Sequence, residues 1–229
     1  MAEINLLDKL PKTRRNVTAR SSAKTAEHIR LSRQFGELYF DGPREYGYGG
    51  YRYDGRWVPV ARDIIARYNL VPGQRVLDVG CAKGFLVKDL LAALPGLEAF
   101  GLDVSEYALM VCEPEVVGRL HLGTAERLPF PDASFDAVIS INTIHNLDRA
   151  GCIRALREFT RILRHPQRCY VQVDAYRTAA GKALFESWCL TAETYLTPAE
   201  WGDLFAEAGY EGDYFWTILE ADENESNAS

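Results

Sequence analysis

The chain has 229 residues, of which 47% are apolar and 25% are charged, and its net charge at pH 7 is −6. This length suits one domain with a substantial core. The acidic balance argues against a protein whose whole surface binds nucleic acid, although it does not exclude a local basic patch. The sequence has no apolar run long enough to cross a membrane and no secretory signal pattern, so we expect a cytoplasmic protein.

Five cysteines are scattered along the chain without C-x-x-C spacing. An odd, dispersed set in a chain without a secretory signal is typical of reduced thiols. We therefore expect neither a disulfide framework nor a zinc site, and no metal ion. The five are Cys81, Cys112, Cys152, Cys169 and Cys189.

Residues 1–34 are locally basic. The first 20 or so are predicted to lack regular structure, and a helix is predicted from Ser22 to Gln34. Two interpretations remain open: a solvated arm with a cap helix, or an arm that helps to close a site or attracts an anionic acceptor. The basic residues are Lys9, Lys12, Arg14, Arg15, Arg20, Lys24, Arg30 and Arg33.

Residues 40–57 read FDGPREYGYGGYRYDGRW, so aromatic side chains alternate with glycines. This composition is too aromatic for a linker and too rich in glycine for a regular strand. It suits a hinged lid over a ligand, in which aromatic faces attract a cation and arginines hold a carboxylate. We propose Tyr46, Tyr51 and Arg56 as lid contacts. The alternative is aromatic packing of the N-terminal segment on the core.

The central stretch, RVLDVGCAKGFL, predicts a strand, a glycine turn and a helix in succession. A helix from Val58 to Tyr68 precedes it. Val76 to Val79 form an apolar run typical of a buried parallel strand, and the helix that begins at Phe85 stops at Pro95-Gly96. Glycines let the backbone approach a ligand closely, and a helix N-terminus offers free N–H groups. The third glycine of a dinucleotide fingerprint is replaced by Phe85, which disfavours a dehydrogenase.

The second strand is predicted from Glu98 to Asp103. Asp103 follows Asp78 near the offset of about 20 residues at which an acidic residue meets ribose hydroxyls in nucleotide-binding units. A carboxylate accepts hydrogen bonds from two neighbouring hydroxyls. Asp103 is alternatively the N-cap of a helix that begins at Ser105, and both roles are compatible.

A short strand is predicted over residues 120–122, a turn over 123–126, and a further strand over 135–141. Ligands lie beyond the carboxyl ends of parallel strands, so the residues after the second of these strands point to a site. His145 is the one histidine of the four that is placed there, and Asn142 precedes it. Alternatively, His145 is a structural, hydrogen-bonded residue and Asn146 belongs to a turn.

The C-terminal part is predicted to contain helices over residues 152–163, 181–190 and 197–208 and strands over 169–174 and 214–219. The arginines of the first helix suit a solvated face. Asp174, Tyr176 and Arg177 lie just beyond a strand end, where they would line an acceptor pocket. The last strand is expected to belong to a hairpin, and residues 221–229 to form a disordered tail.

Two motifs together resemble the class I S-adenosylmethionine-dependent methyltransferases. The small residues of GCAKG resemble the G-x-G-x-G loop of that family, and GTAERLPFPDASFDAV resembles its G-D-A-E-x-L-P-F-x-x-x-S-F-D-x-V segment. Ala82 and Thr124 depart from the family pattern, and we expect both departures to be tolerated. The resemblance implies a three-layer, Rossmann-like α/β fold of about seven mostly parallel strands with an antiparallel C-terminal strand, here with an N-terminal helical and aromatic cap.

The resemblance also implies the site residues. The loop from Gly80 to Gly84 and Asp78 would hold the methionine end of S-adenosylmethionine, Asp103 the ribose, and Thr124 with Ala125 the adenine. His145 is the candidate base, assisted by Asn142. The full set expected to contact the cofactor is Asp78, Gly80, Cys81, Ala82, Lys83, Gly84, Phe85, Asp103, Val104, Thr124, Ala125, Glu126 and Asn142, together with the lid residues.

The resemblance therefore implies methyl transfer to an oxygen or nitrogen atom of a small molecule by in-line displacement. We expect residues 1–57 to form an arm and cap and residues 58–220 the methyltransferase domain of a monomer or homodimer, without a nucleic-acid or membrane partner. The alternatives are a methyltransferase acting on tRNA or protein through the basic arm, and a non-catalytic module that binds S-adenosylmethionine.

Overall fold

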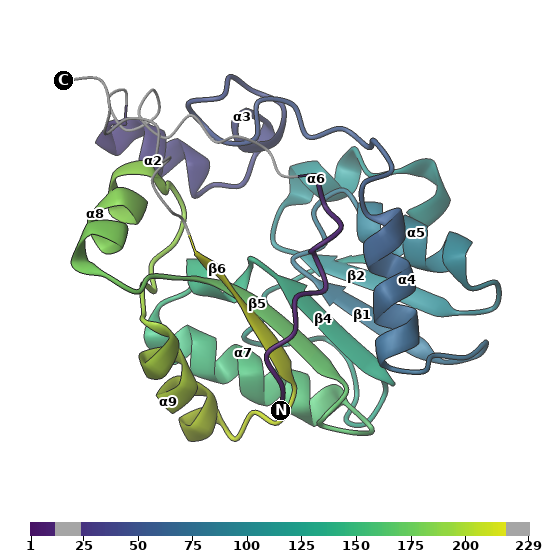
Figure 1. Cartoon of the computed structure of the whole chain (residues 1–229). Coiled ribbons are helices and arrows are strands. Elements are labelled where there is room, and N and C mark those ends of the chain that lie inside the picture. Colours follow the sequence, from purple (N-terminus) through teal and green to yellow (C-terminus); the bar gives the residue numbers. More distant parts are fainter. Residues whose placement is uncertain (12–23, 219–229) are drawn as a thin grey trace.

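The computed structural model describes residues 1–11 and 24–218. Its centre is a six-stranded sheet in the order β3-β2-β1-β4-β5-β6, and every strand pair is parallel (Figure 1). Short apolar runs without Gly or Pro inside them explain most of these strands. The strands are β1 (Arg75–Val79), β2 (Glu98–Asp103), β3 (Leu120–Leu122), β4 (Ala137–Ile141), β5 (Cys169–Ala175) and β6 (Asp213–Ile218).

Helices cover both faces of the sheet, as the alternation of side chains along each strand requires. Val76 and Ile139 point to one face and pack with α4 (Val58–Arg67) and α5 (Phe85–Ala93). Leu77 and Val138 point to the other face and pack with α7 (Arg149–Ile162) and α9 (Pro198–Ala208). The remaining helices are α2 (Ala26–Ser32), α3 (Glu37–Phe40), α6 (Glu106–Met110), α8 (Ala179–Trp188) and the 3₁₀ turns η1 (Pro114–Val116) and η2 (Ile144–Asn146).

The expected antiparallel C-terminal strand is wrong for the described residues. β6 runs parallel to β5, with Tyr170 opposite Asp213 and Ala175 opposite Ile218. The chain leaves β5, passes through α8 and α9, and so returns to the end of the sheet from which β5 started. A crossover of this kind produces a parallel pair, whereas a hairpin would have produced an antiparallel one. The expected tail, residues 221–229, lies outside the described residues.

The N-terminal segment covers the outer edge of β6. The Ile4 N–H donates to the Tyr214 carbonyl oxygen at 2.9 Å, and the Tyr214 N–H donates to the Ala2 carbonyl oxygen at 3.0 Å. The Leu6 side chain is buried in the core. Residues 1–11 are therefore attached to the sheet, although no regular structure was predicted for them, and the edge of β6 is protected from other strands.

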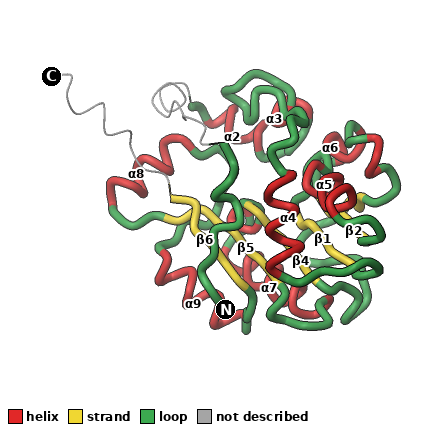
Figure 2. The backbone as a smooth tube through the Cα atoms, turned by 45° about the vertical axis from the view of Figure 1, so that its right-hand side comes forward, coloured by secondary structure: helices red, strands yellow, loops and turns green. Residues whose placement is uncertain are grey.

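The cap comprises α2, α3 and the loop of residues 41–57, and its helices lie together at one end of the sheet (Figures 1 and 2). Lys83 of the glycine loop forms an ion pair with Asp41 of the cap at 2.6 Å, and the Tyr107 hydroxyl donates to the same carboxylate. The Tyr53 hydroxyl donates to Asp89 on α5. These contacts hold the cap over the carboxyl ends of the strands.

Several element boundaries differ from the prediction by a few residues. The expected helix over 22–34 is the shorter α2, with Thr25 as its N-cap, and residues 22–23 lie outside the described part. The expected helix over 152–163 begins earlier because Asp148 caps it by accepting from the Gly151 N–H. Within the described residues, no helix combines the length and the hydrophobicity needed to cross a membrane.

Candidate active site

The loop after β1 has left-handed backbone conformations and close internal contacts that favour glycine. Gly80 has φ +84°, and a Cβ there would lie 2.0 Å from the Thr143 Oγ1 atom. Gly84 has φ +79° and starts α5. Ala82 also has a positive φ, +49°, at the position where the family pattern has glycine. Its N–H donates to Asp103 Oδ2 at 2.8 Å, which helps to hold this unusual conformation.

Two buried carboxyl groups lie beside this loop. No described residue donates a hydrogen bond to Asp78, and burial, followed by the charge of Asp103, raises the pKa of its carboxyl to about 8. Asp103 accepts from the N–H groups of Ala82 and Ser105, each at 2.8 Å. Burial raises the pKa of Asp103, whereas these hydrogen bonds act in the opposite direction. The N-cap of α6 is Ser105 and not Asp103, so that alternative role of Asp103 is wrong.

A cavity of about 180 Å³ lies at the ends of β2 and β3 and contains part of the expected nucleoside site. Asp103, Val104, Thr124 and Ala125 all line it. Glu126, which was grouped with them, instead forms an ion pair with Arg154 of α7 at 2.5 Å and is not among the residues that line it. The Thr124 hydroxyl accepts from the Glu126 N–H within the turn.

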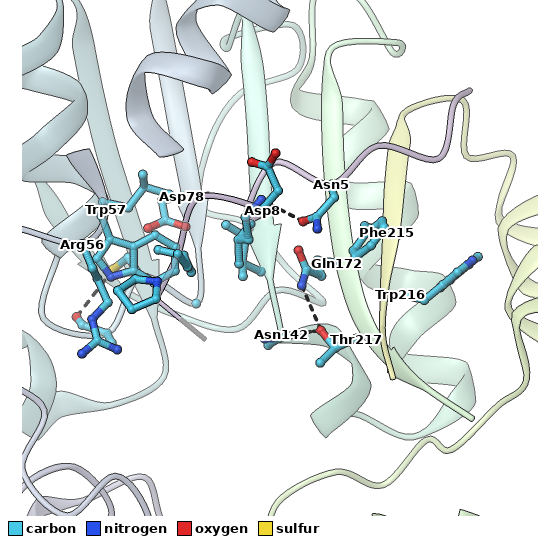
Figure 3. Close-up of a pocket in the computed structure, with 18 of the residues that line it drawn as sticks. Asn5, Asp8, Arg56, Trp57, Asp78, Asn142, Gln172, Phe215, Trp216 and Thr217 are labelled. Atoms are coloured by element: carbon cyan, nitrogen blue, oxygen red, sulfur yellow. Dashed lines mark hydrogen bonds between the residues drawn. The ribbon is translucent and has the colours of Figure 1, made fainter. Parts of the chain in front are cut away.

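A second cavity of about 850 Å³ extends from the glycine loop to the end of β6 (Figure 3). Asp78 and the loop residues Gly80, Cys81 and Ala82 form one part of its wall. Asn5 and Asp8 of the N-terminal segment and Thr217 of β6 form another. Sequence reasoning missed these last three residues, because only long-range pairing with β6 brings the N-terminal segment here. The apolar residues of INLLDKL were the available signal that this segment packs on the core.

A third cavity, of about 470 Å³, lies between the cap and the ends of β4 and β5. Tyr51 and Arg56 line both this cavity and the 850 Å³ one, and Phe85 lines the 470 Å³ one. The Tyr51 ring stacks on Phe85 with centroids 4.7 Å apart. Tyr46 lines none of the three cavities, because its ring packs edge-on against His28 of α2.

Tyr48 and Asn142 line all three cavities and so mark the place where they meet. The Tyr48 ring stacks on Phe40 with centroids 5.8 Å apart and remains 41% exposed. Asn142 has φ +52°, a conformation that asparagine tolerates better than most residues. Its Oδ1 accepts from the Thr217 hydroxyl at 3.0 Å, and Gln172 Nε2 donates to that hydroxyl at 2.9 Å (Figure 3). Asn142 is therefore held in place by Thr217 of β6, which Gln172 of β5 in turn orients.

His145 is buried and forms a pair with Asp174. Its Nδ1 accepts from the Asp174 N–H at 3.1 Å, and its Nε2 lies 3.5 Å from Asp174 Oδ2. Burial lowers the pKa of the imidazole, whereas the Asp174 charge raises it. The neutral ring therefore carries its proton on Nε2, facing the carboxylate. Both residues line the 470 Å³ cavity, and Arg177 lines the 850 Å³ one.

Two predicted contacts of the glycine loop have a structural role. The Lys83 side chain is bound to Asp41 of the cap, and Gly84 packs against Val116, which a Cβ would approach to 2.8 Å. Neither residue is among those that line the three cavities. Among the described residues, no cluster of three or more His, Cys, Asp or Glu could hold a metal ion.

Comparisons with known proteins agree with this architecture. Residues 77–171 match a family model described as a methyltransferase domain. A demethylmenaquinone methyltransferase from Symbiobacterium thermophilum is 28% identical over 200 residues, which cover 72% of this chain and 80% of that protein. A cycloartenol-C-24-methyltransferase from Arabidopsis thaliana is 30% identical over 167 residues, or 64% of this chain, but the match spans only 44% of that relative.

A solved structure also resembles this chain. A chain from a complex with the Trm112 methyltransferase activator of Haloferax volcanii superposes with a TM-score of 0.52 at 26% identity, covering 65% of this chain and 66% of that one. The matched family model includes the glycine loop, Asp103 and the turn at Thr124, and these residues border the cavities described above. These matches identify residues 77–171 as a methyltransferase domain of the class I S-adenosylmethionine-dependent type.

Proposed function

We propose that this methyltransferase transfers the methyl group to an oxygen or nitrogen atom of a small molecule. The observation that carries the proposal is the meeting of three cavities at Tyr48 and Asn142. One cavity suits a nucleoside, one contains the glycine loop, and the third contains the His145–Asp174 pair. This arrangement allows a donor and an acceptor to be aligned at one point, and alignment of this kind supplies up to about 7–11 kcal/mol of rate acceleration.

The residues present fit S-adenosylmethionine. Asp78 has a buried carboxyl group to which no described residue donates, so it suits the ammonium group of the methionine portion. Asp103 retains lone pairs for the ribose hydroxyls, because each of its oxygens accepts one backbone N–H. Val104, Thr124 and Ala125 would border the adenine. When bound, the cofactor supplies a methyl group that its sulfonium charge activates.

The aromatic cap would exclude water and favour a positively charged group. Tyr51 is held against Phe85 and Tyr48, with ring centroids 4.7 and 4.4 Å away. Aromatic faces attract cations, and their attraction is stronger when water is excluded. We infer that Tyr48 and Tyr51 border the sulfonium and that Arg56 completes the rim. Tyr46 would act by packing α2 against the loop.

The Asp174 carboxylate, positioned by His145, would receive the proton of the acceptor, because both ring nitrogens of His145 are engaged with Asp174. A positioned base contributes a factor of typically about 10²–10⁴ to the rate. The His145 Nδ1 accepts from the Asp174 N–H, so the ring proton lies on Nε2. That Nε2–H faces the Asp174 carboxylate and orients it. Asn142, at the junction of the cavities, would orient the acceptor beside the pair.

A binding test and a turnover test address different parts of the proposal. Asp103→Ala should abolish binding of S-adenosylhomocysteine in calorimetry, whereas Asp203→Ala, an exposed substitution on α9, should leave it unchanged. Near-normal affinity of Asp103→Ala would remove the ribose assignment.

The turnover test uses acceptors identified from a metabolite library by mass spectrometry. His145→Ala should lower kcat far more than cofactor affinity, and the exposed His165→Ala should lower neither. Methylation of carbon in every product would contradict the acceptor atom proposed.

A further inference from the structure

The 470 Å³ cavity has an uneven distribution of charge. Three arginines of the loop at residues 41–57 line it: Arg44, Arg52 and Arg56. Two carboxylates also line it, Asp54 from the same loop and Asp174 from the end of β5. The cap side of the cavity therefore contains three guanidinium groups and one carboxylate, although the chain as a whole has a net charge of −6.

The contacts of these arginines differ. Arg56 is neutralised, because its Nε and Nη2 both donate to the Asp54 carboxylate, at 2.8 and 2.5 Å. Arg44 donates from Nη1 to the Tyr48 carbonyl oxygen. Arg52 forms no hydrogen bond or ion pair with any described residue, in contrast to Arg67, Arg154 and Arg161, which form ion pairs with carboxylates. Arg52 thus brings an unneutralised charge to the cavity.

The backbone around Arg52 is held on both sides. Tyr51 stacks on Phe85, and Tyr53 packs edge-on against the same ring with centroids 5.6 Å apart. The Tyr53 hydroxyl also donates to Asp89 at 2.6 Å. Both neighbours are therefore anchored to α5, which fixes the place where the exposed Arg52 side chain leaves the backbone.

We propose that the methyl acceptor is a small anion whose carboxylate or phosphate group is bound by Arg52. The inference rests on the proposed function, since it assigns the 470 Å³ cavity to the acceptor. A guanidinium group binds either oxyanion through two parallel N–H···O hydrogen bonds. The acceptor would place its anionic group against the cap and its nucleophilic atom near Asn142 and His145, at the other side of the same cavity.

The test compares matched probes on the full chain saturated with S-adenosylhomocysteine. Benzoate, phenyl phosphate and neutral benzamide are titrated by calorimetry at one low ionic strength, because salt screens exposed charges. The variants are Arg52→Gln and, as a matched control, Arg62→Gln on α4, an exposed arginine that lines none of the three cavities. The thermal unfolding of each variant is measured alongside.

We expect at least one anion to bind more tightly than benzamide, and Arg52→Gln to raise the Kd of that anion about three- to tenfold. Arg62→Gln should change it by less than twofold. The anion that binds more tightly identifies a carboxylate or a phosphate acceptor. Equal binding of anions and benzamide, an equal effect of the two variants, or no anion binding would overturn the inference. Failure of the S-adenosylhomocysteine titration itself would instead overturn the proposed function.

Discussion

Cofactor binding should release a proton from Asp78, and the number released should depend steeply on pH. Burial and the charge of Asp103 raise the pKa of this carboxyl to about 8, so it holds about 0.9 proton at pH 7 and about 0.1 at pH 9. An ammonium group placed beside it stabilises the carboxylate and lowers that pKa. We therefore expect release of about 0.9 proton at pH 7 and about 0.1 at pH 9 when S-adenosylhomocysteine binds.

The assay is isothermal titration calorimetry in buffers with different ionisation enthalpies, at both pH values. The slope of the observed binding enthalpy against the ionisation enthalpy gives the number of protons exchanged. Because the ligand amine also titrates, the informative quantity is the difference between the wild-type protein and Asp78→Asn. The variant keeps the size and shape of the side chain but has no carboxyl proton to release.

The same shift predicts how stability depends on pH without the ligand. A carboxyl whose pKa rises from 3.8 to about 8 on folding contributes stability that is fully present below pH 3.8 and is lost as the pH rises through about 8. Unfolding by urea should show a steeper decline between pH 6 and pH 9 in the wild-type protein than in Asp78→Asn. Identical proton release and identical pH dependence in the two proteins would refute the reasoning.

Three further predictions concern the loop, the cap and the buried histidine. Gly80→Ala should lower the free energy of unfolding by about 1–3 kcal/mol, because the added methyl group meets Thr143. The control Gly202→Ala, within α9, should raise it by up to about 1 kcal/mol. Equal urea midpoints of the two variants would contradict this prediction. Asp41→Asn should weaken S-adenosylhomocysteine binding several-fold and leave the urea midpoint nearly unchanged, because it loosens the cap at Lys83; unaltered affinity would show that the ion pair does not support the site. Burial lowers the pKa of His145, so the neutral imidazole contributes stability that is present above pH 6.5 and is lost as the pH falls below it. Urea midpoints should therefore fall more between pH 7 and pH 5 in the wild-type protein than in His145→Asn. Parallel declines in the two proteins would contradict the assignment.

The elements that carry strong local patterns were predictable from sequence. β2 has the bounds expected, and β1 and α5 follow from an apolar run and a glycine turn. These features depend on interactions between residues that are close along the chain, such as the left-handed conformations of Gly80 and Gly84. The helix that begins at Pro198 was equally predictable, because its capping box is encoded in four consecutive residues.

The direction of β6 and the position of the N-terminal segment depended on pairings between distant parts of the chain. A strand pattern does not state which neighbour it pairs with, so β6 was assigned to a hairpin although α8 and α9 return it parallel to β5. Residues 1–11 reach the site only because their backbone pairs with Tyr214. The apolar residues of this segment indicate that it packs on the core, but they do not indicate which strand it pairs with.

The sequence determined the class of protein and the chemistry of its loop, because a glycine turn, two acidic residues and a strand end specify local backbone and donor groups. Only the tertiary structure decided which side chains face the cavities. Tyr48 reaches the junction whereas Tyr46 packs on α2, and both nitrogens of His145 face Asp174. Such orientations follow from packing among residues far apart in the sequence, where no local pattern distinguishes one tyrosine from the next.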